Sequence, residues 1–201
     1  MGQIVFEKLK VIDLLEKKIR ENGTTEPDLQ KILEGAPWLI DPSWECLTKN
    51  RPLKTFRSSF EAWYKKEYKE EILTSTEVPH MTKRPDFIFL HLGNSAKIVE
   101  IKKPGHSFND TDWNRFYKYD EAAKKFITAN NGFLKDFPDG IKYIVVTDGV
   151  SLSHTPNLAF NSLKQNNLLE HYSWEILLRN TKTTHQTFID ARESSSNTLP
   201  K

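Results

Sequence analysis

Cysteine is almost missing from this sequence, since Cys46 is the sole example among 201 residues. A single cysteine excludes an internal disulfide bond and provides too little sulfur for a structural zinc site. The sequence also lacks the apolar run of about 18 or more residues that a membrane-spanning helix needs, and it lacks the apolar core of a secretory signal. We therefore expect a cytoplasmic protein that has no membrane partner.

A strong excess of charge of one sign is lacking too. The chain has 29 Lys and Arg residues against 27 Asp and Glu residues, which gives a formal net charge of +2. Protein domains that coat nucleic acid commonly have a pI above about 9. The charge balance therefore neither proves nor excludes a nucleic-acid partner, and any such contacts must be local. The six histidines show no metal-ligand spacing, and there is no Gly-rich loop that would bind phosphate.

Apolar residues at helical spacing predict six helices, over residues 2–21, 24–35, 54–73, 110–129, 158–169 and 173–190. Short apolar runs bounded by turn residues predict strands over 86–91, 96–102 and 141–147, with a weaker candidate over 74–78. This order favours an α/β fold with a small mixed sheet flanked by helices. We expect a separate amino-terminal helix over 1–22, one domain over 23–191 and a disordered tail over 192–201.

The chemically informative residues lie in the predicted hairpin of residues 86–102. Side chains alternate between the two faces of a strand, so Glu100 and Lys102 should point the same way. If the hairpin is centred on Gly93, Asp86 lies directly opposite Glu100. Two opposed carboxylates are destabilising unless a positive group lies between them. The pattern therefore predicts a cation site formed by Asp86 and Glu100.

The predicted cation is Mg²⁺, for which Mn²⁺ can substitute, because hard carboxylate oxygens are the ligands that Mg²⁺ prefers. The backbone carbonyl of Ile101 would be a further oxygen ligand. Such an ion lowers the pKa of a bound water and polarises a phosphoryl oxygen, while Lys102 orients the water or stabilises charge on phosphorus. An alternative stays open, since a Glu-x-Lys pair on a solvent-facing strand and a Pro-Asp turn before a strand are both common.

Several segments, taken together, resemble bacterial nucleases of the PD-(D/E)XK type. They are Glu26–Gln30, Pro37–Ile40, Arg84–Phe87, Val99–Gly105 and Trp174–Asn180 with His185. The chain is similar over about residues 24–190 to the nuclease domain of Shedu antiphage defence proteins. It is also similar to the nuclease-like domain at the carboxyl end of some Hsp90-type ATPases.

The resemblance implies a restriction-endonuclease-like core, hydrolysis of phosphodiester bonds, and a role in bacterial defence against foreign DNA. It implies that Asp86 and Glu100 bind the metal ion, that Lys102 is the catalytic lysine, and that Glu26 completes the metal site. For Glu26 an alternative stays open, because a carboxylate is also favourable at the amino end of any helix.

One departure from the family pattern concerns substrate binding. Related domains often have a Gln-x-x-x-Tyr pair on the helix after the lysine, whereas here Arg115 precedes Tyr119. Arginine can contact phosphate directly, so Arg115, Tyr119 and Lys103 are the predicted substrate-binding residues. Lys83, Arg84 and His106 should flank the same cleft.

The alternative function is a catalytically silent module that binds nucleic acid or assists assembly and retains the nuclease fold. Paired acids repel phosphate, which favours the enzyme. The helix over 1–22 lies outside the resemblance, so it is interpreted as the end of a longer protein with a sensor or ATPase domain, or as a helix for homo-oligomer formation. Asp148-Gly149 is interpreted as a turn, and the aromatics of residues 113–126 as core.

Overall fold

The computed structural model describes residues 2–41, 62, 65–66, 88–92, 95–129, 138–187 and 189–190. Asp86, Arg84, Lys83, the predicted helix over 54–73, the weaker strand candidate over 74–78 and the tail over 192–201 lie largely or wholly outside these residues. Within them the chain is an α/β protein, as the sequence predicted.

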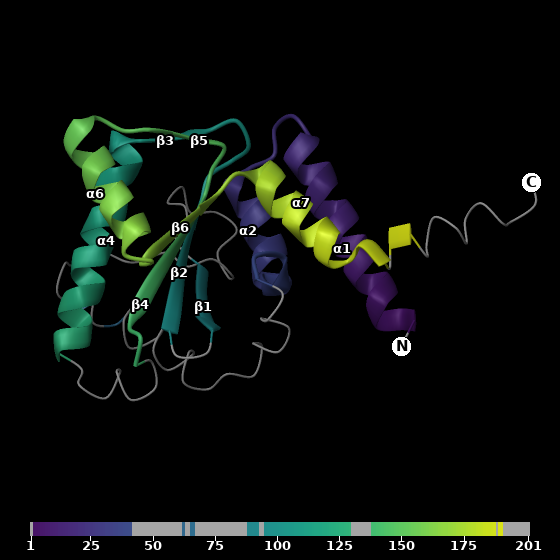
Figure 1. The fold of residues 1–201 in the computed structure, drawn as a ribbon, viewed down its shortest axis with the longest axis horizontal. Helices are drawn as coiled ribbons and strands as arrows, with labels where there is room; N and C mark the ends of the chain where they lie inside the picture. Colours follow the sequence, from purple (N-terminus) through teal and green to yellow (C-terminus); the bar gives the residue numbers. More distant parts are fainter. Residues whose placement is uncertain are drawn as a thin grey trace, which may run out of the picture.

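The main sheet has four strands in the order β1-β2-β4-β6. They are β1 (Ile88–Leu92), β2 (Ser95–Ile101), β4 (Ile141–Val146) and β6 (Leu169–Tyr172). β1 is antiparallel to β2, whereas β2, β4 and β6 run parallel, so the sheet is mixed (Figure 1). A second, two-stranded parallel sheet joins β3 (Ser107–Asn109) to β5 (Gly149–Ser151).

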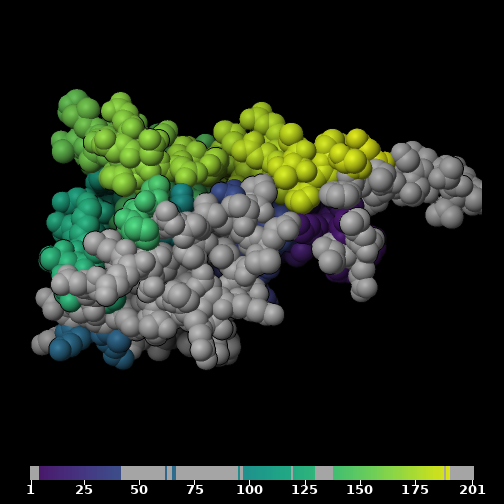
Figure 2. Space-filling view, turned by 60° about the horizontal axis from the view of Figure 1, so that its bottom comes forward, coloured from purple at the N-terminus to yellow at the C-terminus, as the bar shows by residue number. Residues whose placement is uncertain are grey.

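Helices cover both faces of the main sheet (Figure 1). They are α1 (Gly2–Arg20), α2 (Glu26–Gly35), the 3₁₀ turn η1 (Pro37–Leu39), α4 (Asp110–Ala129), α6 (His154–Gln165) and α7 (Trp174–Thr184). α4 and α6 lie next to each other on one face of the sheet. Figure 2 shows the teal α4 beside the green α6, and the yellow α7 further along the same side of the molecule. None of the helices in the described part of the chain is long and apolar enough to cross a bilayer.

Side-chain alternation along β2 and β4 divides the interior into two cores. Ile98, Tyr143 and Val145 pack with Trp113, Phe116 and Phe160 of α4 and α6. The intervening residues point the other way, where they pack with α1, α2 and α7. This second core contains Val99, Ile101, Ile144, Val146, Leu9, Ile12, Leu15, Leu29, Leu33, Trp174, Leu177 and Leu178. The predicted amino-terminal helix thus shares a core with the rest of the chain.

The prediction of a helix over 158–169 is wrong in its bounds. α6 begins earlier, at His154, and ends at Gln165, while Leu169 is already in β6. Asn167 has a φ of 55°, a left-handed conformation that asparagine tolerates better than most residues and that ends the helix. The strands β3, β5 and β6 were not predicted, because three or four residues carry too little periodicity to be recognised.

The predicted register of the hairpin is also wrong, by one residue. Pairing of Asp86 with Glu100 requires Ile88 opposite Ile98, but Ile88 lies opposite Val99, and Leu92 lies opposite Ser95. The connection therefore has two residues and is centred between positions 93 and 94, as is common in tight hairpins. The observed register gives no support to a directly opposed carboxylate pair.

Candidate active site

Five charged or ionisable side chains meet on the α4 side of the main sheet, at the carboxyl end of β2. The Lys102 Nζ lies 2.6 Å from Glu100 Oε1 and 3.0 Å from Asp112 Oδ1. Arg115 reaches the same Glu100 oxygen at 3.2 Å, and His106 Nε2 lies 2.6 Å from Asp112 Oδ2. These residues are called the ion cluster below. The prediction that Glu100 and Lys102 lie on one face is confirmed.

The inner part of the ion cluster is closed to solvent. The side chains of Lys102, Glu100 and Asp112 are 2%, 3% and 10% exposed, whereas those of His106 and Arg115 are 26% and 37% exposed. Removing charges from water is costly, and mutual attraction offsets that cost only when the groups are well paired. Because His106 and Arg115 are the more exposed members of the cluster, a ligand that arrives from solvent contacts them first.

Opposing effects determine the protonation states in the ion cluster. Burial by itself lowers the pKa of Lys102, but the Glu100 carboxylate outweighs it, and the pKa of Lys102 is raised from its ordinary value. Burial raises the pKa of Asp112, but hydrogen bonds from His106 and the backbone N–H of Asn109, together with Lys102, outweigh it, and that pKa is lowered. Lys102 is therefore an ammonium and Asp112 a carboxylate at neutral pH.

Asp112 is the member of the ion cluster that the sequence analysis missed. It is in the first turn of α4, where the Asn109 Oδ1 accepts from the backbone N–H groups of Thr111 and Asp112. In return, Asp112 Oδ2 accepts from the backbone N–H of Asn109 at 3.1 Å. Such a reciprocal arrangement is a capping box. The Asn-x-x-Asp spacing was a usable signal for the helix start, but nothing local showed that Asp112 meets Lys102.

A tight turn places His106 beside Asp112. The backbone N–H of His106 donates to the Lys103 carbonyl at 3.1 Å, with Pro104 and Gly105 between them. Gly105 has a φ of 77°, which the third position of a type II turn requires and which glycine adopts without strain. Proline in the second position of the turn is preset for it, so the chain direction after Lys102 is encoded locally.

Residues that follow β4 hold this turn in place. The Thr147 hydroxyl donates to the His106 carbonyl at 2.8 Å, and Asp148 Oδ2 accepts from the backbone N–H of Gly105 at 2.6 Å. Asp148 also accepts from the backbone N–H of Trp174 at 3.0 Å, and the indole N–H of Trp174 donates to the Lys102 carbonyl at 2.7 Å. Asp148 thus links the turn to α7, a role beyond the simple turn that the sequence suggested.

Arg115, a predicted substrate-binding residue, lies on the side of α4 that faces Glu100 and Lys102. Lys103 is exposed on the turn. Tyr119 belongs to α4, but its side chain is outside the described set, so its predicted substrate contact stays a prediction.

Glu26 is half-buried at the first residue of α2, where Thr25 and Asp28 form the capping box. Its predicted approach to the metal site also stays a prediction. The Ile101 side chain points into the second core. Because the Lys102 N–H donates to Val146 in β4, strand alternation directs the Ile101 carbonyl toward the β1 side.

The described part of the site offers an incomplete set of metal ligands. No group of three or more His, Cys, Asp or Glu side chains among the described residues is arranged to hold a metal ion. Glu100 provides one hard carboxylate. Mg²⁺ commonly binds through one or two carboxylates and keeps several waters. The donors present therefore suit Mg²⁺ in type, and the predicted ligand Asp86 lies outside the described residues.

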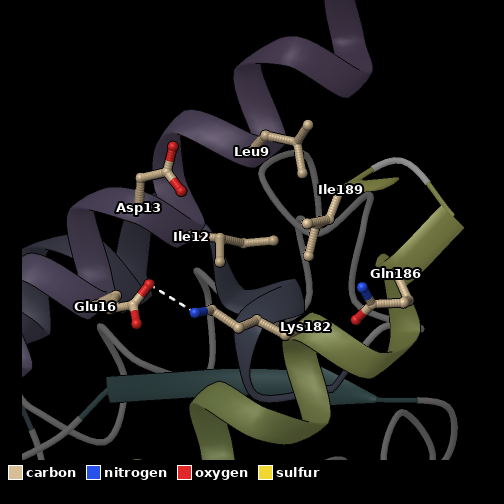
Figure 3. A pocket seen from close by; sticks show the side chains of 7 residues that line it. All are labelled: Leu9, Ile12, Asp13, Glu16, Lys182, Gln186 and Ile189. Carbon is tan, nitrogen blue, oxygen red and sulfur yellow. Dashed lines mark hydrogen bonds and ion pairs between the residues drawn. The ribbon is translucent and has the colours of Figure 1, made fainter. Parts of the chain in front are cut away.

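A pocket of about 330 Å³ lies elsewhere, between α1 and α7 (Figure 3). Its lining includes Asp13, Glu16 and Lys182, and Lys182 Nζ lies 2.6 Å from Glu16 Oε2. α1 and α7 pack on the opposite face of the sheet from α4. The pocket therefore does not belong to the ion cluster.

Comparisons with protein-family models, with curated proteins and with solved structures each give no match to this chain. The resemblance to PD-(D/E)XK nucleases therefore stays a prediction, and the chemistry must be argued from the residues of the site.

Proposed function

We propose that this chain is a metal-dependent endonuclease that hydrolyses phosphodiester bonds, with DNA as the substrate. The observation that carries the proposal is the buried Lys102 ammonium at the end of β2, held by the carboxylates of Glu100 and Asp112. Buried charges of this kind are seldom the most stable solution for a protein interior. Perturbed and closely coupled charges are characteristic of functional sites.

The order of elements supports the same proposal. A helix (α2) precedes the β1-β2 hairpin, a helix (α4) follows it, and β4 then pairs in parallel with β2. This succession fits the restriction-endonuclease-like core that the resemblance implies. The Glu100-Ile101-Lys102 sequence occupies the end of a central strand of the sheet, with neighbours on both sides.

In the proposed reaction each described residue has a role that follows from its position. Glu100, with Asp86, Glu26 and the Ile101 carbonyl, would hold Mg²⁺ or Mn²⁺. When bound, such an ion supplies a polarised phosphoryl oxygen and a water acidic enough to attack near neutral pH. Lys102 stabilises the negative charge that develops on the phosphoryl oxygens. Arg115, at the exposed edge, binds a phosphate of the substrate.

The central prediction compares two buried lysines: Lys97, in β2, and Lys102, which directly follows β2. Lys102→Met should abolish cleavage of plasmid DNA in Mg²⁺ or Mn²⁺, and EDTA should abolish it in the wild type. Lys97→Met is the matched control. Lys97 is 5% exposed, on the opposite face of β2, and paired with Glu170 at 2.7 Å. The Lys97→Met variant should still cleave DNA, provided that it folds, which circular dichroism would show.

Parallel assays on plasmid, single-stranded DNA and RNA would identify the substrate. Equal cleavage by the wild type and by Lys102→Met would show that Lys102 has no role in the reaction. The proposed role in antiphage defence has a separate test, in which bacteria that express the chain or its Lys102→Met variant are infected with phage. Protection that needs Lys102 supports that role.

The second candidate is a catalytically silent module that binds nucleic acid. One observation favours it: Glu100 Oε1 is already engaged by both Lys102 and Arg115, at 2.6 and 3.2 Å. A carboxylate so engaged must exchange partners before it binds a metal ion. DNA binding that is indifferent to EDTA, without cleavage in any divalent metal, would establish this alternative.

A further inference from the structure

Three features of the ion cluster point beyond the roles assigned so far, and all concern His106. Its ring lies 2.6 Å from Asp112, its backbone is held by the Lys103–His106 turn, and it is one of the two members of the cluster with substantial exposure. The residue therefore has a fixed position, a carboxylate partner and access to solvent.

The tautomer of His106 follows from the state of its partner. An ionised carboxylate only accepts hydrogen bonds. Since Asp112 is ionised at neutral pH, the short contact requires a proton on His106 Nε2. Among the described residues this is the one hydrogen bond that the ring makes. Nδ1 is therefore the ring nitrogen that the contact with Asp112 leaves for a substrate.

The two cations of the cluster, Lys102 and Arg115, are poor proton donors. Arg115 keeps its charge at any pH that a protein tolerates. Lys102 is 2% exposed and held by two carboxylates, which stabilise its charged form. Imidazole exchanges protons in the neutral range, and an oriented imidazole with a carboxylate behind it is an effective general acid or base.

We propose that His106 is a catalytic residue of this site, a general acid that Asp112 orients. The inference rests on the proposed function. As the oxygen of water bonds to phosphorus, the bond from phosphorus to the leaving oxygen breaks and its electron pair stays on that oxygen. The acid is the doubly protonated ring, in which Nε2–H stays with Asp112 and Nδ1 gives its proton to this oxygen, which leaves as an alcohol. The attacking water becomes a phosphate oxygen and releases a proton to solvent, from which the neutral ring is then reprotonated.

Asp112 is a positioning residue in this proposal. Its Oδ2 holds the Nε2 proton of His106, while its Oδ1 contacts Lys102. One carboxylate thus sets the distance between the proton donor and the ammonium that stabilises the phosphoryl charge.

The test uses DNA in which sulfur replaces one bridging oxygen of the scissile phosphate, on the 3′ side or the 5′ side. A thiolate leaves without receiving a proton, so such a substrate does not need a general acid. His106→Gln is the informative variant, because the glutamine amide can replace Nε2–H as a donor to Asp112 but cannot transfer a proton. His154→Gln is the matched control, since His154 is exposed at the first residue of α6.

We expect His106→Gln to cleave ordinary DNA about 10²-fold or more slowly than the wild type in Mg²⁺. It should cleave one of the two sulfur-bridged substrates at close to the wild-type rate, and DNA binding in Ca²⁺ should be unchanged. His154→Gln should match the wild type throughout.

Two results would overturn the assignment of His106. An undiminished rate of His106→Gln on ordinary DNA would show that the ring transfers no proton. An equal defect on ordinary and on both sulfur-bridged substrates would show that the His106 ring has a structural role and transfers no proton. Failure of the wild type to cleave any substrate would instead overturn the nuclease proposal itself.

Discussion

At the scale of single residues, Asp112 joins the buried lysine of the ion cluster to its histidine and to the start of α4. Its two oxygens contact Lys102, His106 and the backbone N–H of Asn109. Glu100 also neutralises Lys102, and it contacts Arg115 one turn further along α4. Loss of Asp112 would leave a buried ammonium with one carboxylate fewer and would remove part of the helix cap.

Asp112→Ala should therefore lower the free energy of unfolding by about 3–5 kcal/mol, as expected when one partner of a buried ion pair is removed. Urea denaturation at pH 7 measures this, with Asp139→Ala, an exposed aspartate, as the control. The folded-state pKa of Asp112 is depressed, so its stabilising contribution is present above its ordinary pKa of 3.8 and is lost as the pH falls below that value. Equal urea midpoints for the two variants would show that the cluster does not depend on Asp112.

At the scale of elements, the Lys103–His106 turn connects the end of β2 to β3 and determines where His106 lies. The turn requires a positive φ at Gly105, and Thr147 and Asp148 hold it from the end of β4. Because β2 and β4 run parallel, their carboxyl ends lie at the same edge of the sheet. The turn and its anchors meet there for that reason.

Gly105→Ala should destabilise the protein by about 1–2 kcal/mol, the cost of a left-handed conformation for an L-residue. Gly35→Ala is the matched control, since an added Cβ meets nothing within 4 Å at either position and only Gly105 has a positive φ. Gly35 is exposed at the end of α2, so alanine there should be neutral or stabilising by about 0.5–1 kcal/mol. Thermal unfolding of both variants provides the measurement, and equal shifts would mean that the backbone at Gly105 adapts.

At the scale of the whole molecule, helices on both faces of the sheet enclose two separate cores. The first core supports α4, which carries Asp112 and Arg115. The second contains α1, whose Leu9, Ile12 and Leu15 are almost fully buried. α1 was expected to be a separate helix, yet its apolar face packs against α2 and α7.

Two adjacent leucines of α1 test how much the second core depends on this helix. Leu15 is 0% exposed and Leu14 is 45% exposed. Leu15→Ala should cost about 2–5 kcal/mol through lost burial and the cavity left behind, whereas Leu14→Ala should change stability little. Chemical denaturation distinguishes them. If both substitutions were tolerated equally, α1 would contribute nothing to the stability of the folded chain.

The sequence by itself determined those features that depend on local spacing. The period of two along β2 placed Glu100 and Lys102 on one face, and the period of 3.6 residues identified α1 and α4. The Pro104-Gly105 pair is a local sequence signal for the turn after Lys102. Each of these features follows from backbone geometry over a few residues, and that geometry depends on the local sequence.

Only the tertiary structure decided which distant segments meet. The contacts of Asp112 with Lys102, of Thr147 with His106 and of Asp148 with Gly105 and Trp174 join residues of different elements. The hairpin register depended on whether the connection had an odd or an even number of residues. The formation of the short strand β6 depended on its pairing with β4. Side-chain periodicity specifies which face of an element is apolar, but not the partner that covers it, because many apolar surfaces of similar size satisfy the same hydrophobic requirement.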